Sequence, residues 1–170
     1  REAQPILQSL YPDGGPHLAV LLNNRARLAW ERDRPEEAID LQKQAVAMHQ
    51  RSFRGDHVMI LVPMTNLARM ALDVGDTAVG VEWADQAVAM ADRLYAQAAH
   101  PYQINALAAL VEARLAQQRV DEAITTAVQM QSVLAGLDSA PESTVQFAAD
   151  VVEQVCAVAT APSGLVCEDR

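Results

Sequence analysis

The sequence has few aromatic residues and cysteines, and only one lysine. Aromatic residues make up 4% of its 170 residues, whereas 51% are apolar, and alanine dominates that apolar share. A core of Ala, Leu, Val and Met without large rings favours closely packed helix pairs. The β-branched residues lie within helical periods rather than in alternating runs, which argues against a β-sheet. The length is that of one ordinary domain with a continuous core.

Positive charge is also scarce. The chain has 22 acidic and 13 basic residues, a formal charge of −9, and Lys43 is its only lysine. This balance repels the phosphate backbone, so we expect no nucleic-acid partner. No apolar stretch is long enough to cross a bilayer, so direct membrane insertion is not expected either. The use of arginine over lysine, together with the abundance of alanine, is typical of high-GC bacterial genomes.

Two segments 42 residues apart are versions of one another. Residues 22–48 read LNNRARLAWERDRPEEAIDLQKQAVAM, and residues 64–90 read MTNLARMALDVGDTAVGVEWADQAVAM. Each copy holds two stretches of helical periodicity joined by a short polar turn. Because such a unit cannot bury its apolar face alone, it must stack on its neighbours. The sequence therefore predicts an all-α fold, a right-handed superhelix of stacked helix pairs.

The repeat register divides the chain into units. We predict three helix pairs, over residues 17–55, 56–99 and 100–136, preceded by the end of an earlier helix at residues 1–16. A closing helix without a partner is expected within residues 137–160, and residues 161–170 form a tail without periodicity. Small residues recur where paired helices should come closest: Ala26, Ala68, Ala38, Gly80, Ala123, Ala45 and Ala87. Larger apolar residues lie beside them: Leu22, Met64 and Leu107.

Residues with catalytic or metal-binding potential have structural explanations. His17, His57 and His100 stand one at each repeat start, too far apart to share one metal ion. Acidic pairs such as Glu36-Glu37 lie at helix starts, where the helix dipole favours negative charge. The sequence contains no phosphate-binding glycine loop, HExxH or CxxC motif. We therefore expect neither an enzyme nor a cofactor.

The two cysteines, Cys156 and Cys167, both lie near the C-terminus. A disulfide between them would tie down the tail, and it would indicate an oxidising compartment such as a periplasm. The alternative is one buried cysteine on the last helix and one incidental thiol, compatible with a cytoplasmic protein. The spacing alone does not decide between these two interpretations.

The segments PHLAVLLNNRARLA, RPEEAIDLQKQAVAM and RGDH resemble tetratricopeptide repeats, in the 42-residue form of kinesin light chains. The second copy keeps TNLARMA, VGD and DQAVAM, and the third keeps HPYQINALAAL and VDEAI, so the resemblance spans residues 16–130. It implies a module that binds a protein or peptide in a concave groove. By analogy we expect a region of a larger bacterial protein, such as a serine/threonine kinase or a transcriptional regulator, because the chain starts at Arg1 without an initiator methionine.

In such repeats the first helix of each pair lines the groove, and ligand contacts come from a row along it. Mapped by the repeat register, this predicted row comprises Asn23, Asn24, Arg27, Glu31, Thr65, Asn66, Arg69, Asp73 and Glu112. The resemblance implies that the asparagine amides hold a peptide backbone, since an amide both donates and accepts.

Each part of the predicted row has an alternative interpretation. The asparagines could instead cross-link helices within the array. Arg27 and Arg69 could receive a carboxylate together, or each could pair locally with the acid one turn along, Glu31 or Asp73. For the whole chain, the alternatives to a peptide-binding groove are self-association as a homodimer and small-molecule sensing.

Overall fold

The computed structural model describes residues 15–159 and 164–167, and all regular structure in this part of the chain is helical. The described residues form seven helices: α2 (Pro16–Trp30), α3 (Pro35–Ser52), α4 (Val58–Asp73), α5 (Thr77–Leu94), α6 (Pro101–Ala116), α7 (Val120–Ala135) and α8 (Glu142–Val158). The prediction of an all-α helical repeat fold is confirmed. The segment predicted over residues 1–14 lies outside the described residues.

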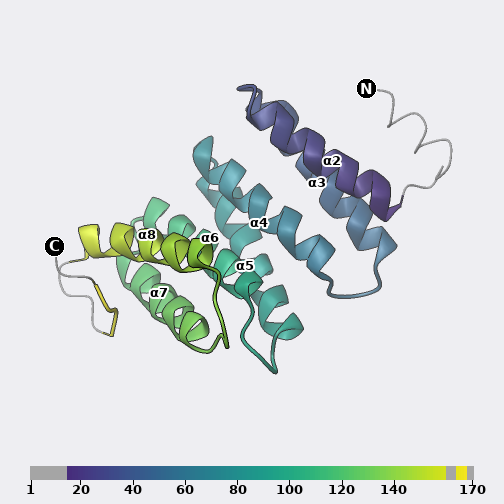
Figure 1. The fold of residues 1–170 in the computed structure, drawn as a ribbon. Helices are drawn as coiled ribbons and strands as arrows, with labels where there is room; N and C mark the ends of the chain where they lie inside the picture. The colour runs from purple at the N-terminus through teal and green to yellow at the C-terminus, as the bar shows by residue number, and fades with distance from the viewer. Residues whose placement is uncertain (1–14, 160–163, 168–170) are drawn as a thin grey trace.

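The helices form three consecutive pairs, α2 with α3, α4 with α5, and α6 with α7, stacked in chain order (Figure 1). Each first helix also packs on the pair before it, so that α4 contacts α3 and α6 contacts both α4 and α5. Helix α8 continues this pattern, because it packs against α6 and α7. It therefore stands in the place of the first helix of a fourth pair.

Helix starts are fixed by proline and by histidine caps. Pro16, Pro35 and Pro101 occupy first-turn positions, where the missing N–H costs no helical hydrogen bond. The Nδ1 atoms of His57 and His100 accept hydrogen bonds from the backbone N–H two residues on, at 3.0 and 3.2 Å. These histidines are therefore helix caps, and no group of metal-ligating side chains occurs in the described residues.

Helix α5 ends at Leu94, so residues 95–99 of the second unit are not helical. The Tyr95 ring stacks on the His100 ring with 4.2 Å between centroids, which requires the chain to leave the helix before the next cap. Pro101 adds to this, since a residue that precedes proline avoids helical geometry.

The small residues predicted at the seams lie where the helices touch. Ala26, Ala38, Ala68 and Ala123 have no exposed surface. A Cβ atom added to Gly80 would lie 2.5 Å from Leu72 Cδ2 and 3.2 Å from the Ala68 carbonyl oxygen, so only glycine fits between α4 and α5 without movement. The predicted packing along the seams is thus confirmed.

Candidate functional site

The predicted row lies on α2, α4 and α6, the first helix of each pair. The repeat spacing aligns Arg27 with Arg69 and Glu112, and it aligns Asn23 with Thr65. Since α4 packs directly on α6, side chains at equivalent positions can meet across the repeats. The structure brings part of the row together and buries another part.

Three amides join the first two repeats. The buried Gln42 of α3 donates from Nε2 to Asn23 Oδ1 at 2.8 Å and to the Pro63 carbonyl oxygen at 3.0 Å. Asn66 Nδ2 reaches the same Asn23 oxygen at 3.5 Å. We call Asn23, Gln42 and Asn66 the amide cluster. The cross-linking alternative therefore describes Asn23 and Asn66, while Asn24 is exposed to solvent.

The amide cluster leaves hydrogen-bonding capacity unused. Asn23 and Asn66 are both half-buried, and the contacts above employ one oxygen of Asn23 and one nitrogen of Asn66. Among the residues that the structure describes, Asn23 Nδ2 and Asn66 Oδ1 have no side-chain or backbone partner. A donor and an acceptor thus remain beside one another, the combination that a peptide backbone requires.

Gln42 was not predicted as part of the site, although the sequence carries a signal for it. It lies on the apolar stripe of α3 that includes Ala38 and Ala45, where a polar side chain must find partners. Its Oε1 atom is buried and has no hydrogen-bond partner within the described residues. A polar residue at helical spacing among small apolar ones is therefore the pattern that could have identified it.

Arg69 pairs across repeats and not along its own helix. Its Nε lies 3.0 Å from Glu112 Oε2, and its Nη2 donates to the Asn105 carbonyl oxygen at 3.2 Å. The guanidinium carbon also lies 5.2 Å from the ring centre of Phe147 on α8, a cation–π distance. The predicted local alternative, a pair with Asp73, is wrong, because Glu112 and Phe147 enclose the guanidinium from α6 and α8. Phe147 escaped prediction because no local pattern places α8 against α4.

The other members of the row differ in exposure. Arg27 pairs with Glu31 one turn along, as the local alternative proposed, and its side chain is 70% exposed. Asp73 is exposed at the last position of α4. Arg27 and Arg69 each have a carboxylate partner, so they do not form a two-arginine clamp in this structure.

Thr65 does not belong to an accessible row. It is 4% exposed, and its hydroxyl donates to the Leu61 carbonyl oxygen at 3.0 Å within α4. Its equivalent Ala108 has no exposed surface. The prediction of Thr65 as a ligand contact is therefore wrong.

The two cysteines are joined near the C-terminal end of the array. Cys156 of α8 and Cys167 of the tail form a disulfide, with 6.1 Å between their Cα atoms. Leu165 is buried beside this bond in the core of α6, α7 and α8. The disulfide and Leu165 together fix residues 164–167 against the last helices.

The fold and the row define a helical repeat protein with a polar surface on its first helices. Residues 17–93 match the model of the tetratricopeptide repeat family. The chain is similar to a Podosopora anserina protein described as a kinesin light chain with nearly identical TPR-like repeats. That crystal structure superposes with a TM-score of 0.66 and 26% sequence identity, over 84% of this chain and 75% of the other. A second structure of the same description gives a TM-score of 0.65 and 26% identity over the same shares.

The repeats over residues 17–93 are therefore tetratricopeptide-like, and the fold of the chain is similar to that of kinesin-light-chain-like repeats. Repeats of this family mediate protein–protein interactions and are typically not catalytic. No curated protein matches the sequence. Among the described helices, none has the length and apolar character needed to span a membrane.

Proposed function

We propose that the first helices of this chain bind an extended segment of another protein, and that the ligand lies over the first two repeats. The observation that carries this proposal is the amide cluster, in which the buried Gln42 fixes Asn23 beside Asn66. A donor and an acceptor held in place by a buried side chain lose little conformational entropy when a peptide backbone binds.

The position of the ligand follows from the state of the arginines. Glu112 of the third repeat and Phe147 of α8 already contact Arg69 of the second repeat, so the α6 end of the row offers few unpaired polar groups. In the first two repeats, Asn24 and Arg27 are exposed and Asn66 is half-buried. A peptide there would meet amides and one exposed ion pair, which suits a segment carrying both charges.

The first experiment is a selection of random linear peptides displayed on phage, with the folded chain as bait. Affinities of the selected peptides would then be measured by fluorescence anisotropy for Asn66→Ala and Asn24→Ala. Loss of one or two backbone hydrogen bonds should weaken binding by about tenfold. Wild-type affinity in both variants would contradict the proposed site.

A matched control is Gln44→Ala on α3. This amide is also exposed, and it bonds only within its own helix, to Asp40 Oδ2 at 2.7 Å. We expect no change in affinity for this variant. Gln42→Leu supplies a second test, since it leaves Asn23 and Asn66 in place but removes the side chain that orients them. Circular dichroism of each variant separates lost binding from lost folding.

A further inference from the structure

Helix α8 has no second helix packed on it in the described part of the chain. Each earlier first helix has one, since α3 packs on α2, α5 on α4 and α7 on α6. After α8, the described residues are only Ala159 and residues 164–167. Within the described residues, the face of α8 that corresponds to the α7-binding face of α6 therefore has no helix of its own pair.

The equivalence between the two helices follows from their N-caps, His100 for α6 and Pro141 for α8, which are 41 residues apart. On α6, the residues in the cluster that includes α7 are apolar and almost wholly buried: Ile104, Leu107, Ala108 and Val111. Their equivalents on α8 are also apolar and small: Val145, Ala148, Ala149 and Val152. Helix α8 thus repeats the apolar pattern on which α7 is seated.

This face of α8 is only partly covered. Ala148 and Val152 are buried in the core, but Val145 is 43% exposed and Ala149 is exposed, whereas the equivalents of these two on α6, Ile104 and Ala108, have no exposed surface. Exposed apolar residues at the spacing of a helix-packing seam are what an unoccupied docking face would show.

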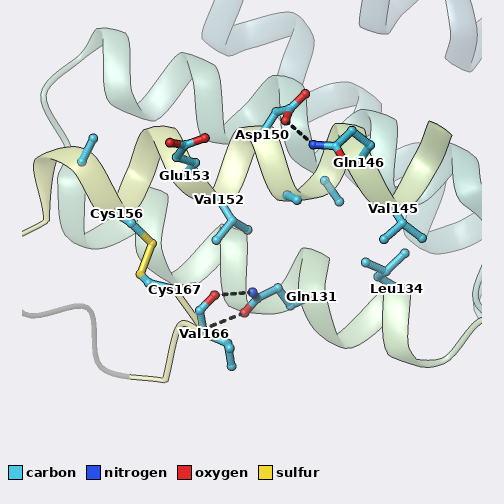
Figure 2. Close-up of a pocket in the computed structure, with 13 residues that line it drawn as sticks. Gln131, Leu134, Val145, Gln146, Asp150, Val152, Glu153, Cys156, Val166 and Cys167 are labelled. Atoms are coloured by element: carbon cyan, nitrogen blue, oxygen red, sulfur yellow. Dashed lines mark hydrogen bonds between the residues drawn. A yellow bond between two sulfur atoms is a disulfide. The ribbon is translucent and has the colours of Figure 1, made fainter. Parts of the chain in front are cut away.

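A cleft of about 920 Å³ runs along this face between α7, α8 and the tail (Figure 2). The disulfide borders it at one end, and Leu134 and Val145 border it at the other. On the α7 side, Gln131 holds the backbone of Val166 through two hydrogen bonds, of 2.9 and 3.2 Å. The tail is thus fixed as one wall of the cleft.

The charge around the cleft has one sign. None of the described residues that line the cleft is Lys or Arg. Asp150 and Glu153 of α8 line the cleft itself. Because the three charges of α8, including Glu142, are all negative, a second copy of this helix would bring like charges together. A partner with basic residues is favoured instead.

We propose that the cleft along α8 is a docking site for an amphipathic helix of a partner protein. That helix has small apolar residues on one face and Arg or Lys on the flanks of that face, and it lies on α8 as α7 lies on α6. This surface is separate from the predicted row and does not depend on the function proposed for it.

The probe for this site is a fluorescein-labelled peptide built on α7 itself, because α7 is the helix that packs on the equivalent face. The peptide keeps the 16-residue sequence of Val120–Ala135 but carries arginine in place of Glu122, Gln129 and Gln131, which flank the apolar seam. A matched peptide carries glutamate at all three positions. Anisotropy is measured with the oxidised chain.

The arginine peptide should bind at least about tenfold more tightly than the glutamate peptide, and its affinity should fall as NaCl rises from about 50 to about 500 mM. Reversing the charge of the cleft with Asp150→Lys and Glu153→Lys should make the glutamate peptide bind more tightly than the arginine peptide. Equal binding of both peptides, or preferences that the reversal leaves unchanged, would overturn the proposal.

Three further measurements test the interpretation. Both reversed residues are exposed, so circular dichroism should show an unaltered helical signal, and Ala149→Glu, which places a charge on the seam, should abolish binding of the arginine peptide. Wild-type affinity in Ala149→Glu would refute a seam contact.

Analytical ultracentrifugation of the chain alone provides the last check. A dimer that Val145→Glu dissociates would mean that a second copy covers α8, and the proposal would fail.

Discussion

Arg69 and Glu112 occupy equivalent positions in adjacent repeats and form an ion pair, with 3.0 Å between Nε and Oε2. Their side chains are 27% and 24% exposed, so water screens the pair only in part. The pair joins α4 to α6, and the contact of Arg69 with Phe147 extends this link to α8. One arginine therefore connects three successive first helices.

The first prediction concerns this pair. Arg69→Met should lower the free energy of unfolding by about 1–2 kcal/mol, because it leaves Glu112 without its partner in a partly buried position. Arg27→Met is the control at the equivalent position, where the Arg27–Glu31 pair is far more exposed, and it should change stability by less than about 0.5 kcal/mol. Urea denaturation measures both. Equal changes in the free energy of unfolding for the two variants would show that the Arg69–Glu112 pair does not stabilise the fold more than the exposed Arg27–Glu31 pair.

The second prediction concerns the closest approach between α4 and α5. Gly80→Ala gains up to about 1 kcal/mol of helix propensity, but its methyl group would collide with Leu72, and overpacking costs about 1–3 kcal/mol. We expect a net loss in thermal stability. Adding Leu72→Ala to Gly80→Ala removes the collision, so the double variant should lose less than the two single variants together. Strict additivity would argue against the collision.

The third prediction is a pH dependence of stability. Burial in α3 lowers the pKa of His49 below its ordinary value of 6.5, and the nearby His57 lowers it further. The folded chain therefore takes up the proton less readily than the unfolded chain. The stability that neutral His49 provides is complete above about pH 6.5 and decreases as the pH falls below that value.

The melting temperature should therefore fall between pH 7.5 and pH 5.5, values chosen about one unit either side of the free histidine pKa. His49→Phe should flatten this dependence, because it removes the buried imidazole. An identical pH profile for wild type and His49→Phe would assign the titration to other groups.

The fourth prediction concerns the disulfide, which closes a loop of sequence separation 11. Its reduction should lower the free energy of unfolding by up to about 3 kcal/mol, chiefly by enlarging the unfolded ensemble. Thermal melts with and without a dithiol reductant measure the difference. The double variant Cys156→Ala with Cys167→Ala should match the reduced protein and ignore the reductant. A melt of the wild type that is insensitive to complete reduction would contradict a stabilising role.

The packing along the repeat seams could be predicted from the sequence, and the candidate site could be predicted only in part. Ala26 and Ala68 repeat at a fixed spacing because each repeat must solve the same local packing problem, and a local pattern reports a local contact. Arg69 shows where this reasoning ends. One of the two interpretations placed its partner one turn along, but the partner lies 43 residues away, since side chains at equivalent positions of α4 and α6 are brought together only by stacking.

The sequence by itself determined the helices, their pairing and the residues at their closest approach, because period, caps and small residues act over a few turns of chain. The tertiary structure alone decided which polar residues face solvent. Thr65 and Asn66 are neighbours on one helix, yet Thr65 is buried and Asn66 joins the amide cluster. That difference depends on which helices pack on each face of α4, and those contacts come from residues far apart in the chain.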